Sequence, residues 1–300
     1  MYTIELAQVR KSYGDFIAVN DLSFSIEQGS VFGLLGPNGA GKTSTIRMMI
    51  GITAPDSGEV RVFGRPFDRQ CLENVGYLPE ERGLYKKMKM LDQLIFLGEL
   101  HGMAATAARQ QSIEWCERLE ISEKLASKVE ELSKGMQQKI QFIAALLHDP
   151  DFIIMDEPFA GLDPVNSDLL KNVLLDMKKK GKTILFSTHR MDQVEKLCES
   201  ICLINRGTSV LQGNLKQVKA QYGKNTVQIQ YEGNGDFLQN NPQVQSFRDY
   251  GNHVDVQLAK GADPQQLLRA AMEHSRVYKF ELMEPPLEQI FIDVVGKTDA

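Results

Sequence analysis

The stretch Gly36-Pro37-Asn38-Gly39-Ala40-Gly41-Lys42-Thr43 is the most informative part of the sequence, because it matches the phosphate-loop pattern G-x-x-x-x-G-K-[ST]. A continuous apolar run, Val31 to Leu35, precedes it, and a helical run, Ser44 to Ile50, follows it. Glycines let backbone N–H groups converge on phosphate oxygens, and the start of a helix adds the positive end of its dipole. The pattern therefore predicts that Gly36 to Ser44 bind nucleotide phosphates. An ordinary glycine turn is the competing interpretation, which the flanking strand and helix disfavour.

Within this loop, two side chains have predicted tasks. Lys42 would neutralise the β- and γ-phosphates, and Thr43 would ligate Mg²⁺. A second apolar run, Phe152 to Met155, ends in Asp156-Glu157. A carboxylate at the end of a buried strand beside a phosphate loop is where a further Mg²⁺ contact belongs, so we assign it to Asp156. Glu157 would accept a proton from an attacking water or orient that water.

The chain is predicted to divide into two domains. Residues 1–219 alternate strands and helices, and the runs Val31–Leu35, Phe152–Met155 and Thr183–Ser187 are short and apolar throughout. Such runs are typical of strands covered on both faces, as a parallel sheet requires. Between the first two runs, residues 91–149 have helical spacing and no convincing strand. We therefore predict an α/β nucleotide-binding domain with a helical insertion.

The remaining residues, 220–300, have a different rhythm. Val244 to Tyr250 and His253 to Leu258 form a predicted hairpin, and Asp263-Pro264 starts a predicted helix that runs to His274. A strand is also predicted from Thr226 to Tyr231, a short helix near Asp236 to Asn240 and a strand from Val277 to Leu282. These elements give the order β-α-β-β-α-β, which a last amphipathic helix from Pro286 to Val295 follows. That order predicts a small α+β, ferredoxin-like domain.

Composition excludes several classes of protein. The chain has 300 residues, 42% of them hydrophobic, so it has enough apolar material for a sizeable core. Its net charge is −5, and residues 220–300 carry −4, which disfavours a nucleic-acid partner. No apolar run approaches the ~20 residues needed to span a bilayer. The four cysteines, Cys71, Cys116, Cys198 and Cys202, are predicted to be reduced core thiols, which favours a cytoplasmic location.

Further motifs make the resemblance to a family specific. Residues 132–139 read LSKGMQQK and resemble the signature motif of ATP-binding cassette (ABC) proteins, shortly before the Asp156-Glu157 strand. Residues 161–164, GLDP, resemble the D-loop of the family, with Asp163 as its carboxylate. His189, in Ser187-Thr188-His189, resembles the switch histidine, and Tyr13 resembles the aromatic residue that stacks on adenine. Taken singly, Tyr13 reads as a core aromatic, His189 as a helix cap and Ser133 as the cap of a helix near Lys134.

The sequence departs from the family pattern in two places. Glu80, after Gly76-Tyr77-Leu78-Pro79, stands where the family usually has the glutamine of its Q-loop. A carboxylate there can still face Mg²⁺ or its water, but it adds negative charge near the γ-phosphate. In the signature, Lys134 and Met136 stand where glycine and glutamine are common, whereas Ser133 and Gly135 are kept. Lys134 either adds phosphate affinity or is a solvated lysine.

The resemblance implies a P-loop ABC ATPase that binds ATP and Mg²⁺ and hydrolyses ATP. In the family, two such subunits sandwich two ATP molecules, and the signature residues Ser133, Lys134, Gly135 and Met136 would serve the partner's nucleotide. The whole chain most resembles ATPase subunits of bacterial sodium- or drug-efflux systems, which work with separate membrane permease subunits. We therefore expect a cytoplasmic protein, peripheral at the inner face of the cell membrane. The alternative is a soluble ABC ATPase that acts as a nucleotide-gated regulator without a permease.

Overall fold

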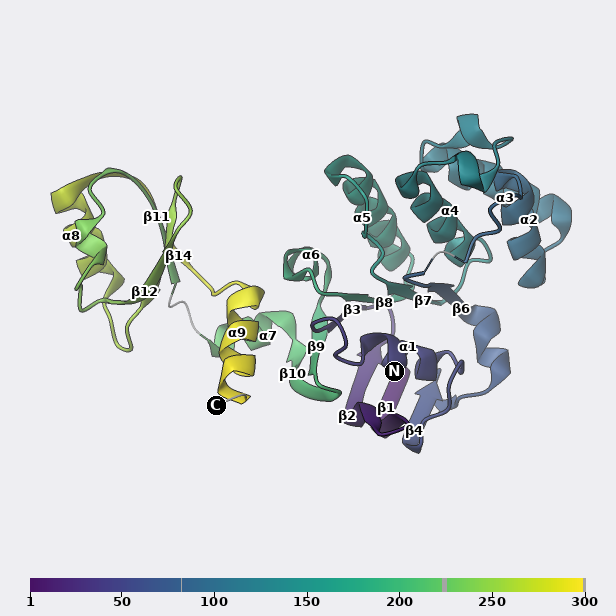
Figure 1. The fold of residues 1–300 in the computed structure, drawn as a ribbon, viewed down its shortest axis with the longest axis horizontal. Coiled ribbons are helices and arrows are strands. Elements are labelled where there is room, and N and C mark those ends of the chain that lie inside the picture. Colours follow the sequence, from purple (N-terminus) through teal and green to yellow (C-terminus); the bar gives the residue numbers. More distant parts are fainter. Residues whose placement is uncertain (82, 223–225, 299–300) are drawn as a thin grey trace. The chain divides into compact units, whose positions relative to one another are not determined.

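The computed structural model describes residues 1–81, 83–222 and 226–298. The chain forms two compact units, Met1–Asn214 and Leu215–Ala300. Figure 1 traces both units along the sequence, and each is described here by itself. None of the helices within these described ranges is both long enough and apolar enough to cross a membrane.

The first unit is built around a six-stranded sheet with the order β10-β9-β3-β8-β7-β6. Its strands β6 to β9 and β3 run parallel, and β10 is antiparallel to β9 at the edge. The strands are β3 (Val31–Leu35), β6 (Val75–Leu78), β7 (Phe152–Asp156), β8 (Thr183–Thr188), β9 (Ser200–Asn205) and β10 (Thr208–Asn214). All residues of β3, β7 and β8 are buried, which confirms the prediction from their continuous apolar runs.

The register of this sheet determines where the phosphate loop lies relative to Asp156 and Glu157. Asp156 at the end of β7 lies opposite Ser187, and Leu35 at the end of β3 lies opposite Thr188. Since parallel strands end at the same edge, the loop that follows β3 and the carboxylates that follow β7 meet there. This edge positions the phosphate loop beside Asp156 and Glu157.

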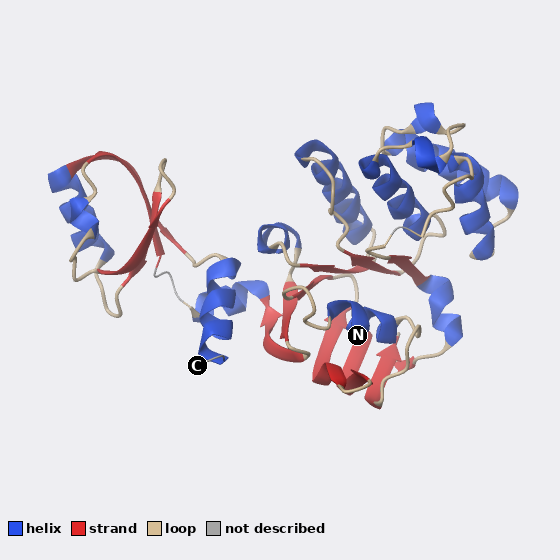
Figure 2. Ribbon diagram, in the orientation of Figure 1, coloured by secondary structure: helices blue, strands red, loops and turns tan. Residues whose placement is uncertain are grey.

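A second, antiparallel sheet with the order β2-β1-β4-β5 was not expected from the sequence. Its strands are β1 (Tyr2–Tyr13), β2 (Phe16–Glu27), β4 (Ser57–Val62) and β5 (Arg65–Pro66). Figure 2 shows helix α1 (Lys42–Met49) next to this sheet. One hydrophobic core joins the two sheets and the helix, because Ile4 and Leu22 from the antiparallel sheet, Ile46 and Met49 from α1, and Phe32 from β3 belong to the same buried cluster.

Helices complete the first unit. Residues 91–149, predicted to be helical, contain most of α2 and all of α3 and α4, with short 3₁₀ turns between them. The helices of the unit beyond α1 are α2 (Met90–Leu100), α3 (Ala105–Arg118), α4 (Lys134–Leu146), α5 (Pro164–Lys179) and α6 (Met191–Leu197), and its 3₁₀ turns are η1 (Arg69–Asn74), η2 (Ser122–Lys124) and η3 (Val129–Glu131). All four cysteines are buried and free of disulfides, as predicted.

The second unit contains a four-stranded sheet with the order β12-β13-β11-β14, in which every neighbouring pair is antiparallel. This is the order of a ferredoxin-like sheet, so the predicted fold class is confirmed. The predicted short helix at Asp236 is only a 3₁₀ turn, η4 (Asp236–Leu238). The other elements are α7 (Leu215–Gln221), β11 (Thr226–Gly233), β12 (Val244–Asp249), β13 (Val254–Leu258), α8 (Pro264–His274), β14 (Ser275–Met283) and α9 (Leu287–Thr298).

Two local predictions about this unit agree with the structure. The carboxylate of Asp263 caps α8, because it accepts a hydrogen bond from the backbone N–H of Gln265 at 2.9 Å, and Pro264 occupies the first turn. On α9, Leu287 and Ile290 of the predicted apolar face are buried.

Candidate nucleotide site

The phosphate loop lies between β3 and α1, and its glycines are required by the backbone. Gly36, Gly39 and Gly41 have positive φ angles of 152°, 79° and 108°. A Cβ atom on Gly36 would lie 2.2 Å from the carbonyl oxygen of Ile204, and one on Gly41 would lie 2.4 Å from that of Ala18. No larger residue fits at these two positions without moving the neighbouring backbone.

Lys42 is folded back onto its own loop. Its Nζ donates hydrogen bonds to the carbonyl oxygens of Gly36 at 2.8 Å and Pro37 at 3.1 Å. Burial lowers the pKa of Lys42, while the nearby carboxylates of Glu157, Asp156 and Glu80 act in the opposite direction. The ammonium group is thus held at the centre of the loop, surrounded by negative charge.

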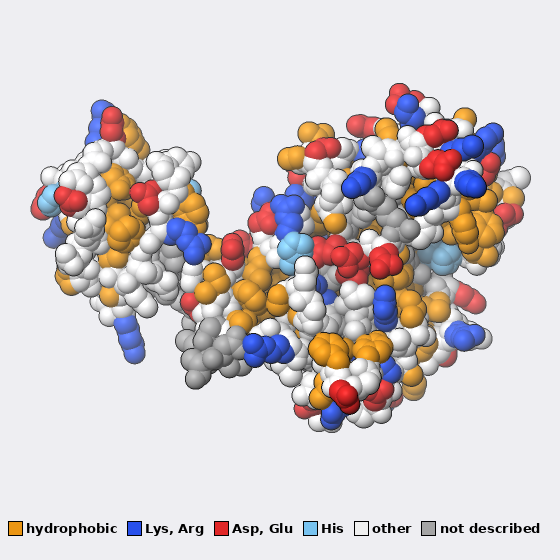
Figure 3. All heavy atoms as spheres, viewed as in Figure 1, with side chains coloured by type: hydrophobic (Ala, Val, Ile, Leu, Met, Phe, Trp, Pro, Cys, Tyr) orange, Lys and Arg blue, Asp and Glu red, His pale blue; other side chains and the backbone are white. Residues whose placement is uncertain are grey.

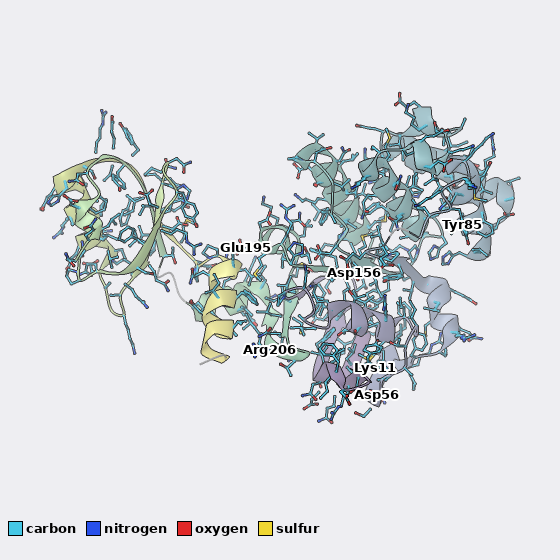
Figure 4. The ribbon with its side chains drawn as sticks, in the orientation of Figure 1. Lys11, Asp56, Tyr85, Asp156, Glu195 and Arg206 are labelled. Atoms are coloured by element: carbon cyan, nitrogen blue, oxygen red, sulfur yellow. The ribbon has the colours of Figure 1, made fainter. Side chains whose placement is uncertain are left out.

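Asp156 and Thr43 bring oxygen ligands together below the loop. The hydroxyl of Thr43 donates to Oδ2 of Asp156 at 2.9 Å, and the hydroxyl of Ser187 donates to Oδ1. Asp156 is only 1% exposed. The burial of Tyr77 and the nearby negative charge of Asp156 raise the pKa of the Tyr77 hydroxyl to about 12. Figure 4 labels Asp156 in the interior of the first unit.

This pair suits a Mg²⁺ ion that is bound together with phosphates. Mg²⁺ usually takes one or two carboxylates, keeps several waters and completes its shell with phosphate oxygens. Thr43 and Asp156 supply a hydroxyl and a carboxylate, and Glu80 adds a second carboxylate to the same cavity. Within the described residues, no group of three or more His, Cys, Asp or Glu side chains is arranged to hold a metal alone. The donor set therefore fits a metal–nucleotide complex.

Glu157 is held by Thr188, at the end of β8, and by His189, which follows that strand. Its Oε1 accepts from the backbone N–H of His189 at 3.0 Å and lies 2.7 Å from Nδ1 of the same histidine. Its Oε2 accepts from the hydroxyl of Thr188 at 3.0 Å. The Glu157 side chain is 11% exposed and that of His189 is 55% exposed, so the pair connects the buried site with the surface. His189 thus contacts Glu157 directly and does not cap a helix; Arg190 is the residue before α6.

These groups surround one cavity of about 350 Å³. It is lined by Asn38 to Ser44 of the loop and by Phe16, Ala18, Glu80, Asp156 and Glu157. Figure 3 shows acidic side chains gathered in this part of the first unit, between α5 and α1. The structure therefore brings the phosphate loop, Glu80 and the two consecutive carboxylates to a single cavity, with His189 bonded to one of them.

Two aromatic residues, Tyr13 and Phe16, lie near the nucleotide cavity, but only Phe16 is among the described residues that line it. The two residues face each other at the end of the β1–β2 hairpin. Tyr13 is 44% exposed, with Nζ of Lys11 5.8 Å from its ring centroid. Sequence reasoning missed Phe16 and Ala18, because their place at the cavity depends on the pairing of β1 with β2.

The signature residues lie away from this cavity. Ser133 caps α4, since its hydroxyl oxygen accepts from the backbone N–H of Met136 at 3.2 Å. Ser133 and Lys134 are exposed, and Gly135 lies beside Leu162, whose Cδ2 would be 3.5 Å from a Cβ at that glycine. None of the residues 133–136 is among the described residues that line the cavity of their own chain.

Asp163 belongs to this same surface segment. Its carboxylate caps α5 by accepting from the backbone N–H of Asn166 at 2.9 Å, and these hydrogen bonds lower its pKa. Gln138 of α4 connects the two helices to the strand β7 region, because its side-chain amide donates to the carbonyl oxygen of Pro158 at 3.1 Å. The signature and the D-loop are thus linked to the segment that carries Glu157, but they are not in the cavity.

Comparisons with known proteins agree with this geometry. The family described as ABC transporter matches residues 19–160, and the family described as ATP-binding protein DrrA1-3-like, C-terminal domain, matches residues 213–295. The chain is 45% identical over 296 residues to the ABC transporter ATP-binding protein YhaQ of Bacillus subtilis, covering 99% of both chains. It is 32% identical over 302 residues to the Nod factor export ATP-binding protein I of Rhizobium sp. (strain N33), covering 98% of this chain and 97% of that protein.

A solved structure shares the fold of the first unit. It is described as the ATP binding subunit of an ABC transporter and has a TM-score of 0.68 and 28% identity. The match covers 74% of this chain and 93% of that one. The chain belongs to the ATP-binding subunits of the ABC transporter family.

Proposed function

We propose that this chain hydrolyses ATP to ADP and phosphate as one subunit of a dimer that powers an exporter through separate membrane permease subunits. The observation that carries the proposal is the cavity in which Thr43 and Asp156 are bonded to each other and Glu157 is bonded to His189 beside the phosphate loop. Export is supported by the relative whose name includes Nod factor export, which spans nearly the whole chain.

In this proposal the chain's own residues divide the work. The backbone N–H groups of Gly36 to Ser44 and the ammonium of Lys42 bind the phosphates, for which Lys42 leaves its present carbonyl partners. Thr43 and Asp156 would hold Mg²⁺, with Glu80 facing the same cavity, and the bound ion would supply positive charge to offset that of the phosphate oxygens.

Glu157 receives the proton of the attacking water, and His189 fixes the orientation of that carboxylate. The backbone of Glu157 has a positive φ of 49°, and its N–H donates to the carbonyl oxygen of Ser187 at 3.0 Å. The carboxylate is thus attached to the sheet edge from both its backbone and its side chain. Tyr13 remains our candidate for stacking on the adenine, with Phe16 as its neighbour at the cavity wall.

The proposed dimer follows from the position of the signature. Ser133 and Lys134 are exposed, Gly135 and Met136 are half-buried, and all four lie outside their own cavity, as does the exposed D-loop residue Asp163. In a head-to-tail pair of chains these residues would close the cavity of the partner subunit. ATP contacts available only in the closed pair would then stabilise it, and hydrolysis would release it.

An apolar groove is our candidate for the permease contact. It has a volume of about 380 Å³ and lies between the end of α1, strand β6 and the helices α2 and α4. Its lining includes Ile52, Tyr77, Pro79, Leu84 and Leu97. Pro79 in the groove directly precedes Glu80 of the nucleotide cavity. A movement of Glu80 would therefore shift the groove wall against a bound permease segment. Figure 4 labels Tyr85, which packs edge-on against Phe96 of α2 at a centroid distance of 5.9 Å.

The experiment is to co-express the chain with a multi-span membrane protein, where one is encoded beside its gene, and to measure its capture from detergent extracts. We expect Leu97→Glu, inside the groove, to reduce capture at least tenfold while ATP affinity stays unchanged. Leu100→Glu is the matched control, because Leu100 is 66% exposed on the same helix and outside the groove. If the parent chain binds no membrane protein and stays in the soluble fraction, the alternative of a soluble nucleotide-gated regulator replaces the exporter.

A further inference from the structure

The nucleotide cavity carries an excess of negative charge. Its described lining contains three carboxylates, on Glu80, Asp156 and Glu157, and a single ammonium group, on Lys42. That ammonium is already bonded to two loop carbonyls, and all three carboxylates act on its pKa. The side chains of the open cavity therefore sum to about two negative charges.

Binding of the nucleotide increases this imbalance. A fully ionised ATP with one Mg²⁺ contributes roughly two further negative charges, and closure by a partner surface removes the water that screens them. A surface that closes such a cavity must bring positive charge, since like charges brought together in a desolvated interface cost several kcal/mol. Glu80 is the exposed member of the three carboxylates, whereas Asp156 and Glu157 are buried and bonded to hydroxyls of their own unit.

The signature, residues 133–136, contains an exposed positive charge that could face the partner's cavity. Lys134 is exposed, follows Ser133 directly and begins α4. In the part of the chain that the structure describes, no carboxylate lies within ion-pair distance of its Nζ. Its four-carbon stem lets the ammonium extend about 6 Å beyond the backbone. Lys134 and Glu80 are also the two positions at which the charge of this chain departs from the family pattern, and the departures have opposite signs.

We propose that Lys134 forms an ion pair with Glu80 of the partner subunit when ATP closes the dimer. This inference rests on the proposed head-to-tail dimer and names a pair of residues that holds it together. Lys134 is a positioning residue: it offsets the additional carboxylate in the partner's cavity and so favours closure. Each of the two composite sites of the dimer would contain one such pair.

The test is a double-mutant cycle on ATP-driven dimerisation, measured by sedimentation in the Glu157→Gln background so that hydrolysis does not reopen the dimer. With Glu80 present, Lys134→Gln should weaken dimerisation about tenfold. With Glu80→Gln in the same chain, Lys134→Gln should change it less than about twofold. The coupling should shrink as salt is raised from 50 to 500 mM.

Control variants distinguish a failure of the Lys134–Glu80 ion pair from a failure of the proposed head-to-tail dimer. Lys128→Gln removes an exposed lysine outside the signature and should have no effect, whether the chain keeps Glu80 or carries Glu80→Gln. Within each Glu80 background, neither Lys134→Gln nor Lys128→Gln should change the affinity of the monomer for ATP, which shows that these variants are folded. Equal weakening by Lys134→Gln in both backgrounds would mean that Lys134 acts on the phosphate and would overturn the pair. If Ser133→Arg leaves ATP-driven dimerisation intact, the head-to-tail dimer itself fails.

Discussion

The phosphate-loop cavity and the signature segment lie in the same unit, yet they differ in how their polar groups are satisfied. In the cavity, Thr43 is bonded to Asp156 and His189 to Glu157, so these polar groups hold one another in place. The signature residues make only the local bonds that start a helix, and Ser133 and Lys134 face outward. One region is therefore organised by contacts within the chain, whereas the polar groups of the other remain open to a partner, as the proposed dimer requires.

Removing the carboxylate of Glu157 tests the organised region and should have the largest effect. Glu157→Gln keeps the shape of the side chain but cannot accept the proton of water, so Mg²⁺-dependent ATP hydrolysis should fall at least a hundredfold. ATP affinity should change less than about threefold, and the closed dimer should accumulate. Phosphate release measures the rate of hydrolysis, and gel filtration with ATP measures the accumulation of the dimer. Hydrolysis at the normal rate would show that another group activates the water.

Removing the ammonium of Lys42 tests the same region through binding. Lys42→Ala should weaken ATP binding roughly tenfold to a hundredfold and prevent ATP-driven dimerisation, because a phosphate charge loses its partner. Equilibrium dialysis with labelled ATP gives the affinity. Lys171→Ala is the matched control, since Lys171 pairs with Asp168 on the surface of α5. An unchanged affinity in Lys42→Ala would contradict the assignment of the phosphate loop.

The far end of the signature helix supplies a pH test. His148 follows α4, lies 3.2 Å from the carbonyl oxygen of Val75 through Nε2, and stacks on His101 at 3.8 Å. Burial lowers the pKa of His148 to about 4, with the neighbouring His101 as a smaller cause. The unfolded chain, with a histidine pKa near 6.5, therefore binds more protons than the folded chain between pH 6.5 and 4.

The free energy of unfolding should consequently fall as the pH is lowered through this window. The contribution of His148 between pH 7 and pH 5 is about 2 kcal/mol. Urea titrations at both pH values measure it, and His148→Phe, which keeps the stacking, should remove that part of the pH dependence. A His148→Phe chain with the same pH dependence as the parent would show that this histidine is not held neutral in the fold.

Deleting residues 224–300 should have the smallest effect on the nucleotide cavity. All described residues that line it belong to the first unit, so ATP affinity should change less than tenfold, or about 1.4 kcal/mol. We expect the lifetime of the dimer or its coupling to the permease to change instead. A larger loss of affinity in a truncated chain that is demonstrably folded would mean that the second unit helps to build the site.

Much of the fold could be predicted because its signals are local. The buried strands β3, β7 and β8 are continuous apolar runs, and the β12–β13 hairpin has Gly251-Asn252 at its turn. The antiparallel sheet of β1, β2 and β4 could not be predicted in this way. The partners in the β1–β4 pairing are far apart in sequence, as Ile4 opposite Val62 shows, and several register shifts interrupt the β1–β2 hairpin.

The same limit applies to the candidate site. The phosphate loop, Asp156 and Glu157 each end or follow a predicted strand, and this is enough to place them together from the sequence. Phe16 reaches the cavity only through the pairing of β1 with β2, and the stack of His101 on His148 joins residues from separate helical segments. No local pattern encodes such contacts, because they depend on how the elements pack.

The head-to-tail dimer can be tested with an ATP analogue that carries a thiol-reactive group on its γ-phosphate. One chain carries Ser133→Cys with Lys42→Ala, and its partner has an intact phosphate loop and Ser133; the four native cysteines are buried and do not compete. A head-to-tail dimer predicts that the chain with Ser133→Cys and Lys42→Ala is labelled only when the partner is present. If that chain stays unlabelled when the partner is present, while a separate monomeric chain with Ser133→Cys and an intact Lys42 is labelled, the signature serves its own nucleotide and the head-to-tail dimer is wrong.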